Sequence, residues 1–332
     1  MCTYCTFVMR HTNDGAIKSE VITENTANLS KGNVLIKVMY SNISSYDIVY
    51  SDHNINKNNN SVRTPGVDAA GIVVESSSSL FHKGDEVVIY GGLGFGIDFA
   101  GGFGQYVRVP DSLIFHLPTG ISLKDSMTIG SDGLAAALAV MEVIISSRDS
   151  KNKNVLVTGA ARGIGAFASA ILKLCGFNVT AVTAYPESES FIRDMGADTV
   201  ISEEKLINKS KEYLLDAKYV AAVDTMGGEV LSYISKILDR DSIVAVCGTS
   251  GSKEFHLSVY PFILRGINLV GIDPLNCSSM LKQDALYKLA GDWYIKSLPL
   301  MCNEISIFEI ADYFEQARNN MVKGRIVINH SI

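Results

Sequence analysis

The residues best suited to chemistry lie in the middle of the chain, where residues 154–165 read N-V-L-V-T-G-A-A-R-G-I-G. Three glycines follow an apolar strand and precede an alanine-rich helix. Glycine lets the backbone turn sharply and approach a phosphate, and the free amides at the start of a helix bind anions. The residues predicted to bind the pyrophosphate of a dinucleotide are Gly159, Arg162, Gly163, Ile164 and Gly165.

The end of the next predicted strand bears on which dinucleotide binds. It reads Thr183-Ala184-Tyr185 and lacks the carboxylate that would hydrogen-bond the ribose hydroxyls and repel a 2′-phosphate. Arg162 is a cation that could reach a 2′-phosphate, although a solvated loop charge is an equally good interpretation. Two glutamates further along would repel such a phosphate. The sequence favours NADP(H) over NAD(H), with Thr183 and Tyr185 facing the adenosine.

The elements around this turn alternate between strands and helices. A long apolar helix is predicted at 124–146. Strands are predicted at 154–158, 178–183, 198–201, 219–224, 242–247 and 268–272, with helices between them. Six short apolar strands in this alternation predict an α/β fold with a doubly wound parallel sheet.

The segments before and after this unit have a different pattern. Short apolar or alternating runs at 33–40, 70–75, 86–90 and 104–109 predict a small barrel or a distorted sheet. An asparagine-rich loop at 53–61 is expected to be exposed. The tail, with helices at 278–295 and 308–319 and strands near 305–307 and 324–329, has no place in a completed six-stranded sheet. We expect it to return to the first domain.

Composition restricts the partners and the compartment. The chain has 332 residues and a net charge of −6 without a basic block, which argues against nucleic-acid and anionic-membrane partners. We find no apolar run near the ~20 residues that a bilayer needs, and no signal-peptide pattern. Six scattered cysteines are typical of a reduced, cytoplasmic protein. Cys2 and Cys5 lack a second cysteine pair, so we expect no metal site.

The motif T-G-A-A-R-G-I-G resembles the fingerprint of short-chain dehydrogenases. Those enzymes carry it near the amino terminus and use a Tyr-x-x-x-Lys pair as the proton donor. Here about 150 residues precede the motif, and none of the fourteen tyrosines has a lysine four positions later. The short-chain interpretation therefore fails.

Eight segments, this turn among them, resemble the medium-chain dehydrogenase/reductase superfamily, and within it the acryloyl-CoA reductase subgroup of the zinc-free quinone oxidoreductase branch. They are 64–71, 101–106, 129–130, 157–165, 195–197, 223–225, 261–265 and 324–325. The resemblance implies a discontinuous GroES-like β-barrel domain, residues 1–125 and 274–332, and a Rossmann domain of residues 126–273. It also implies a homodimer. The segment 261–265, P-F-I-L-R, is the more specific marker of the subgroup.

The resemblance also bears on metal chemistry. Zinc alcohol dehydrogenases have a His-Glu pair where this chain has Val67-Asp68, and they carry a four-cysteine lobe that this sequence lacks. The resemblance therefore implies hydride transfer without a metal, to a carbon–carbon double bond polarised by a carbonyl or to a quinone. The protein would supply positioning and hydrogen bonds to the substrate oxygen.

A polar cluster lines the reaction cleft in the resembled subgroup. The catalytic residues that the resemblance implies are Asp47, Asp68, Arg325, Ser44 and Tyr46, with Ser45 at the cofactor. Ser44 stands where the family has asparagine, and Ser45 and Tyr46 replace a tyrosine and a lysine. Tyr46 could serve as a hydroxyl proton donor. The two aspartates and the arginine are equally well interpreted as a buried ion network that fixes the barrel against the nucleotide domain.

The resemblance further places Thr249 and Ile263, at the tips of later strands, beside the nicotinamide. Together these features predict a cytoplasmic NADPH-dependent reductase of an activated alkene, such as a 2-enoyl thioester like acryloyl-CoA or an enone, or of a quinone. The alternative is a family member that binds the nucleotide without catalysis and serves a binding or structural role. The departure at Ser44-Ser45-Tyr46 motivates that alternative.

Overall fold

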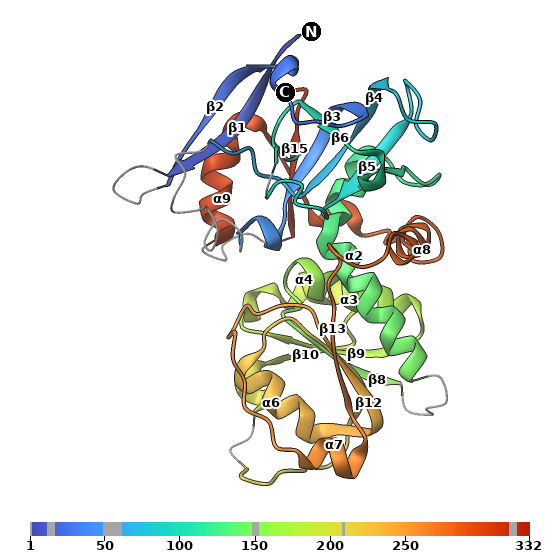
Figure 1. The fold of residues 1–332 in the computed structure, drawn as a ribbon. Coiled ribbons are helices and arrows are strands. Elements are labelled where there is room, and N and C mark those ends of the chain that lie inside the picture. The colour runs from blue at the N-terminus through green and yellow to red at the C-terminus, as the bar shows by residue number, and fades with distance from the viewer. Residues whose placement is uncertain are drawn as a thin grey trace. The chain divides into compact units, whose positions relative to one another are not determined.

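The structure, a computed structural model, describes residues 2–11, 17–48, 62–97, 99–147, 153–207, 210–318 and 324–332. The chain divides into two compact units (Figure 1). Unit 1 consists of Met1–Ser131, Pro274–Gly291 and Leu298–Ile332, and unit 2 of Asp132–Asp273 and Asp292–Ser297. The predicted boundary at residue 125 precedes the observed crossing by six residues, because the crossing lies inside a helix. The asparagine-rich loop at 53–61 falls outside the described residues.

Unit 1 is built around a mixed sheet. Its elements are β1 (Thr3–His11), β2 (Ile17–Asn25), β3 (Val34–Ile43), β4 (Asp68–Ser76), β5 (Glu86–Tyr90), β6 (Tyr106–Val109), β7 (Phe115–His116), α8 (Ser279–Ala290), β14 (Cys302–Ser306), α9 (Ile310–Arg318) and β15 (Arg325–Asn329). The main sheet has the order β14-β15-β3-β4-β5-β7, and β6 pairs with β3. The four strands predicted in this part of the chain correspond to β3, β4, β5 and β6. The antiparallel β1–β2 hairpin was not predicted.

The carboxyl-terminal tail returns to this unit, as expected. Strand β15 pairs antiparallel with β3. Three aromatic rings from distant parts of the sequence meet in the core. The ring centre of Phe103 lies 6.1 Å from that of Phe7 and 6.5 Å from that of Phe314, and both pairs are edge to face. Burial of such rings contributes both apolar area and a favourable ring geometry. The discontinuous GroES-like domain is thus held together by its core.

Unit 2 contains the predicted parallel sheet. Its elements are β8 (Asn154–Thr158), α3 (Gly163–Leu174), β9 (Asn178–Thr183), α4 (Glu189–Asp194), β10 (Thr199–Ser202), α5 (Glu203–Leu206), β11 (Tyr219–Asp224), α6 (Gly228–Ile237), β12 (Leu238–Val246), α7 (Tyr260–Arg265) and β13 (Asn268–Gly271). The strand order is β10-β9-β8-β11-β12-β13, and every pair is parallel. Because the order reverses between β8 and β11, this is a doubly wound Rossmann sheet. The predicted fold class is confirmed.

Helix α2 (Leu123–Ser146) differs from its prediction as one continuous helix. The backbone breaks at Gly130, where φ is 55° and ψ is −168°, values that glycine adopts far more easily than other residues. By length and composition α2 could also cross a membrane, but 78% of its most apolar stretch is buried within the protein. A buried apolar helix of this kind is typical of a globular core.

Candidate functional site

The turn after β8 has the backbone that a phosphate-binding loop requires. Gly159 has a φ of 63°, and a Cβ atom there would lie 2.1 Å from Thr225 Oγ1. At Gly165 a Cβ would lie 2.5 Å from the carbonyl oxygen of Gly159, so the first turn of α3 packs directly on the loop. Arg162 is extended and precedes α3, which begins at Gly163. Side chains at either glycine position would block this approach, and the helix amides face the turn.

The two residues predicted to select the cofactor lie together. The guanidinium carbon of Arg162 lies 4.3 Å from the centre of the Tyr185 ring, within cation–π range. The backbone amide of Tyr185 donates to Thr183 Oγ1 at 2.9 Å, which holds the residue just beyond the end of β9. A cation is therefore present at the strand end where NADP-binding sheets recognise the 2′-phosphate.

A second arginine on the following helix, Arg193, is already paired within the protein. Arg193 forms an ion pair with Glu189 at 2.8 Å, and its Nη1 donates to the carbonyl oxygen of Asp198 at 3.0 Å. The pair lies on the exposed surface of α4, where such pairs contribute little stability. Arg193 is therefore held by Glu189 and by the backbone of Asp198.

The ends of β11 and β12 complete this edge of the sheet. Asp224 accepts a hydrogen bond from Thr158 Oγ1 at 2.7 Å and another from the amide of Gly227 at 2.8 Å. Burial raises the pKa of Asp224, and these two donors partly oppose the rise. Thr249 is exposed on the loop after β12, at the same edge as the phosphate-binding turn. The predicted placement of Thr249 after a late strand agrees with the structure.

The placement of Ile263 at a strand tip was wrong. Ile263 lies on α7, which leads into the start of β13, and 69% of its surface is exposed. Since the strands are parallel, this residue lies at the amino-terminal edge of the sheet, opposite Gly159. Arg265, the last residue of the segment 261–265, has a structural role. Its Nη1 donates to the carbonyl oxygens of Lys236 and Leu238 at 2.9 and 2.7 Å. These carbonyls belong to the end of α6 and the start of β12.

In unit 1 the predicted polar residues form two separate groups. In the first, Asn42 Nδ2 donates to Asp68 Oδ2 at 3.0 Å, and Asn42 Oδ1 accepts from Arg325 Nη2 at 2.8 Å. Asp68 Oδ2 also accepts from the amide of Ser131 at 2.7 Å. All three side chains belong to residues that are at most 4% exposed. An asparagine thus joins the acid to the arginine, and it is Asn42 rather than a residue at position 44.

The second group surrounds Asp47. One carboxylate oxygen, Oδ2, accepts from the amide and the hydroxyl of Ser44 at 2.9 and 2.8 Å. The other, Oδ1, accepts from the amides of Gly66 and Val67 at 3.1 and 3.0 Å. Asp47 therefore fastens the helical turn at 45–48 to the segment before β4. The predicted single ion network of Asp47, Asp68 and Arg325 is two hydrogen-bonded groups.

Burial shifts the pKa of both carboxyl groups upward. Desolvation raises the pKa of Asp47 to about 6, against the lowering effect of its hydrogen bonds with Ser44, and the charge of Asp68 raises it further. Burial is also the main cause that raises the pKa of Asp68, opposed by the Ser131 amide, Asn42 and Arg325. Perturbed acids of this kind occur both in active sites and in structural networks.

The remaining predicted residues differ in exposure. Ser44 is buried, Ser45 is exposed and Tyr46 is half-buried. Asn42 was missed by sequence reasoning, although an asparagine within an otherwise apolar strand was an available signal. Thr128 and Ser131, whose backbone groups complete the first group, carried no signal because any residue supplies a carbonyl and an amide.

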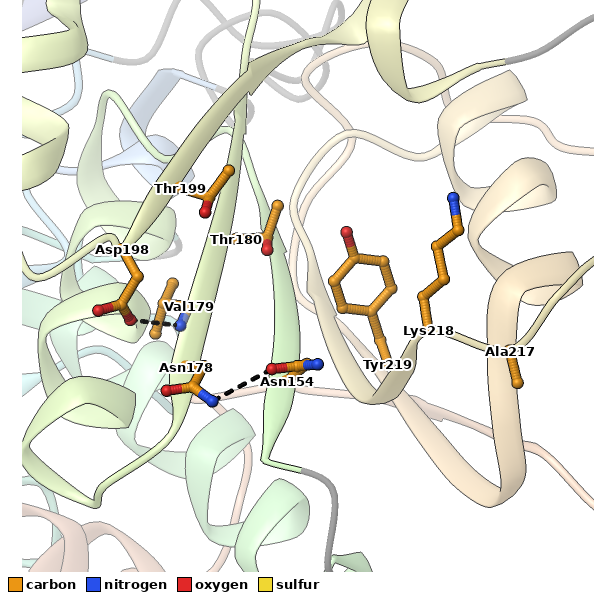
Figure 2. A pocket seen from close by; sticks show the side chains of 9 residues that line it. All are labelled: Asn154, Asn178, Val179, Thr180, Asp198, Thr199, Ala217, Lys218 and Tyr219. Carbon is orange, nitrogen blue, oxygen red and sulfur yellow. Dashed lines mark hydrogen bonds between the residues drawn. The ribbon is translucent and has the colours of Figure 1, made fainter.

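Unit 2 has a hollow away from these residues (Figure 2). It has a volume of about 540 Å³ and is lined by Asn154, Asn178, Val179, Thr180, Asp198, Thr199, Ala217, Lys218 and Tyr219. Four of these are the first residues of β8, β9, β10 and β11. The hollow is therefore at the amino-terminal edge of the sheet, opposite the glycine turn, and includes none of the predicted site residues. Within the described ranges, no three side chains of the metal-ligating types come together.

Two family models match the chain. The model described as alcohol dehydrogenase GroES-like domain covers residues 30–119, and the one described as zinc-binding dehydrogenase covers residues 163–290. The chain is 32% identical over 313 residues to the putative quinone oxidoreductase YhfP of Bacillus subtilis, which covers 94% of each chain. It is 28% identical to the probable acrylyl-CoA reductase AcuI of Escherichia coli over 95% of this chain and 96% of the relative.

Solved structures give the same result. The yhdH oxidoreductase of Salmonella enterica in complex with NADP matches with a TM-score of 0.91 and 27% identity, over 98% of this chain and 99% of that one. The Bacillus subtilis protein yhfP with NAD bound matches with a TM-score of 0.94 and 30% identity, over 99% and 100%. The chain therefore belongs to the medium-chain dehydrogenase/reductase superfamily of oxidoreductases, in the quinone oxidoreductase and acrylyl-CoA reductase branch.

Proposed function

We propose that the protein is a cytoplasmic NADPH-dependent reductase that transfers hydride to an activated carbon–carbon double bond, or to a quinone, without a metal ion. Acrylyl-CoA and related short 2-enoyl thioesters or enones are the alkenes that its relatives suggest. The observation that carries the proposal is the glycine turn with Arg162 stacked on Tyr185, in a chain whose relatives are reductases.

The residues present fit a dinucleotide with a 2′-phosphate. The turn of Gly159 to Gly165 and the start of α3 would hold the pyrophosphate. Arg162 would contact the 2′-phosphate, and no carboxylate at the end of β9 opposes it. A neighbour that was solved with NADP supports this choice, while another was solved with NAD. The bound coenzyme would supply the hydride.

The chain's own groups would then position the substrate and manage one proton. Asn42, Asp68 and Arg325 form one buried polar group, and Asp47 forms another. Tyr46 is half-buried and carries a hydroxyl, so it is our candidate for the proton donor to the reduced substrate. A reaction of this type relies on orientation and on hydrogen bonds to the substrate oxygen, which need no Lewis acid.

An assay of NADPH oxidation tests the proposal. Acrylyl-CoA, 1,4-benzoquinone and a simple enone are offered separately to the enzyme treated with a chelator. Turnover on at least one acceptor is expected, with the same rate before and after the chelator. Binding of NADPH without turnover on any acceptor would instead favour a family member that only binds the nucleotide. A rate that depends on added zinc would refute the metal-free part.

Cofactor choice is tested at Arg162. Loss of a cation from a 2′-phosphate contact is expected to weaken NADPH binding about tenfold or more, while NADH binding changes less than about twofold. Dissociation constants of both coenzymes are measured for the wild type, Arg162→Ala and the control Arg193→Ala. Arg193 is the matched control because it pairs with Glu189 on α4. Equal affinity of the wild type for NADPH and NADH would contradict the assignment.

We also propose that the protein is a homodimer formed through the edge of the unit 2 sheet. Strand β13 is the last in the sheet order, so one of its sides offers unpaired backbone groups to another strand. The segment 255–269, which leads into this strand, carries six apolar side chains that are at least 38% exposed, namely Phe255, Val259, Tyr260, Ile263, Leu264 and Leu269. A second copy would cover both features. Light scattering should give twice the chain mass of 35.9 kDa, falling to the monomer in Leu269→Lys but not in the control Met280→Lys.

A further inference from the structure

Three buried side chains of unit 1 surround the break in α2. A Cβ atom added to Gly130 would lie 2.6 Å from Asn42 Nδ2, 2.8 Å from Arg325 Nη2 and 2.9 Å from Asp68 Oδ2. We call Asn42, Asp68 and Arg325 the kink clamp. The clamp contacts Gly130, the residue of α2 whose backbone angles are not helical.

The clamp satisfies the two helix ends that the break creates. Asp68 Oδ2 accepts from the amide of Ser131, the first residue after the break, at 2.7 Å. On the other side, Arg325 Nε donates to the carbonyl oxygen of Thr128 at 3.3 Å. Helix ends leave such groups without intrahelical partners, and an acid is favourable at a helix start while a cation is favourable at a helix end. Asn42 links the acid to the arginine, so both ends are held by one group.

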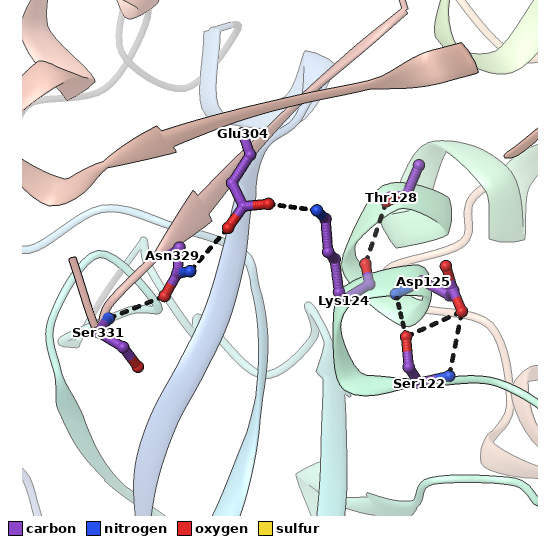
Figure 3. Close-up of polar contacts among 7 residues, drawn as sticks. All are labelled: Ser122, Lys124, Asp125, Thr128, Glu304, Asn329 and Ser331. Carbon is purple, nitrogen blue, oxygen red and sulfur yellow. Dashed lines mark hydrogen bonds and ion pairs between the residues drawn. The ribbon is translucent and has the colours of Figure 1, made fainter. Parts of the chain in front are cut away.

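The first half of α2 is also fixed to the unit 1 sheet (Figure 3). Lys124 forms an ion pair with Glu304 on β14, and Glu304 Oε1 accepts from Asn329 Nδ2 on β15 at 2.7 Å. Ser122 and Asp125 bond to each other at the helix start, with Ser122 Oγ donating to Asp125 Oδ2 at 2.8 Å. The part of α2 before Gly130 is therefore attached to the unit 1 sheet. The helix is kinked at Gly130.

The chain passes from unit 1 to unit 2 at this same place. Ser131 is the last residue of the unit 1 segment and Asp132 is the first of unit 2. Asp132 is 3% exposed, and a Cβ atom at Gly163 would lie 3.1 Å from its Oδ2. Consecutive residues thus contact the kink clamp on one side and the phosphate-binding turn on the other.

From this juxtaposition we infer that Asn42, Asp68 and Arg325 are positioning residues for the proposed hydride transfer. They act by holding the backbone at Gly130 in one conformation. Gly130 directly precedes Ser131 and Asp132, where the chain passes from unit 1 to unit 2. The inference rests on the proposed reductase function, because hydride transfer is the step whose rate depends most strongly on the position of the reacting groups. Small errors of position are enough to slow such a step by one to two orders of magnitude.

The decisive variant is Gly130→Ala, which adds one methyl group within the clamp and removes no polar group. We expect kcat to fall about tenfold or more, while the dissociation constant for NADPH stays within about twofold. The primary isotope effect with 4-deuterated NADPH should rise, since hydride transfer becomes slower relative to product release. Gly84→Ala is the matched control, because Gly84 has a φ of 99° but nothing lies within 4 Å of its added Cβ. Its kcat should stay within about twofold.

A double variant separates positioning from direct chemistry. If Asp68 acts through the backbone at Gly130, Gly130→Ala combined with Asp68→Asn should lose no more activity than the worse single variant, within about twofold. Losses that multiply, or a kcat for Gly130→Ala equal to that of the control, would overturn the inference. Multiplied losses would mean that Asp68 contacts the reacting atoms.

Hydrogen exchange tests the clamp without any turnover. The amides of residues 131–135 should exchange faster in Gly130→Ala than in the wild type or Gly84→Ala. Unchanged exchange in Gly130→Ala would refute the inference. If the wild type binds NADPH but reduces no acceptor, the proposed function fails, whereas this measurement still reports on the clamp alone.

Discussion

Two buried aspartates, one in each unit, use their carboxylate oxygens differently. Asp224 in unit 2 has a partner on each oxygen, the Thr158 hydroxyl on Oδ1 and the Gly227 amide on Oδ2. Asp68 in unit 1 accepts hydrogen bonds from Asn42 and from the Ser131 amide, both on Oδ2. Its Oδ1 is buried and has no hydrogen-bond partner among the described residues.

The difference teaches what each acid does for the fold. A carboxylate with both oxygens bonded is part of the scaffold, and removing an acceptor leaves a buried donor unsatisfied. A buried oxygen without a partner raises the energy of the charged form and leaves room for one further interaction. Both acids have a raised pKa, so burial alone does not distinguish them, and the pattern of partners does.

The largest expected effect concerns a third acid, Asp47, whose oxygens both carry two donors. Its folded-state pKa of about 6 lies above the ordinary value of 3.8, so protonated Asp47 is favoured in the folded protein. The stability it contributes is fully present below pH 3.8 and is lost as the pH rises through 6. The free energy of unfolding of the wild type should therefore fall by about 2.4 kcal/mol relative to Asp47→Asn between pH 4 and pH 7.

Urea unfolding of both proteins over this pH range measures the difference, and other titrating groups cancel in it. Asp47→Asn will itself be less stable, because its amide must face a donor, but only the slope matters. A difference that stays constant or grows with pH would show that the four hydrogen-bond donors affect the pKa of Asp47 more than burial does. The buried aspartates would then have to be compared by their number of donors alone.

Asp224→Asn is expected to have the next largest effect. The new amide group must replace one acceptor, so either the Thr158 hydroxyl or the Gly227 amide loses its partner. The cost should be about 2 kcal/mol in the free energy of unfolding, measured by urea unfolding at pH 7. A cost below about 0.5 kcal/mol would mean that neighbouring groups reorient. The fold would then not need both oxygens of Asp224 as acceptors.

Asp68→Asn should have the smallest effect on stability. The asparagine can place its oxygen where Oδ2 is and keep both bonds, while its amide takes the side that has no partner. We expect the free energy of unfolding at pH 7 to change by less than about 1 kcal/mol. The same urea titration measures it. A loss of unfolding free energy equal to that of Asp224→Asn would mean that the number of bonded oxygens does not distinguish the two acids. The effect of Asp68 on activity is a separate matter.

Local sequence signals explain most of what could be predicted. The glycine turn and the six strands of unit 2 follow from residue patterns within short stretches, although Asp224 bonds both to Gly227, three residues away, and to Thr158, 66 residues away. The contacts of Asp68 join residues separated by 26 and 63 positions, and Asn42 and Arg325 are 283 apart. Residue type alone could suggest a polar cluster there, but not that Asn42 joins it.

Two further features were not predicted. The break at Gly130 depends on side chains that cap it from distant strands, and the residues Gly130, Ser131 and Asp132, although poor helix formers, do not by themselves show that the helix breaks there. Ile263 was placed at a strand tip from the resemblance, although Pro261 at the start of α7 and Gly266 after its end are local signals of a helix. Its position became clear only from the parallel order of the sheet.

The stack of Arg162 on Tyr185 has a consequence for the speed of ligand capture. A free arginine side chain samples many rotamers and must give up this freedom when it meets an anion, which costs roughly 1 kcal/mol. Here the ring already restricts the guanidinium before any anion arrives. The entropy loss on association would be correspondingly smaller for a phosphate that binds to Arg162, because the guanidinium is already restricted by the ring.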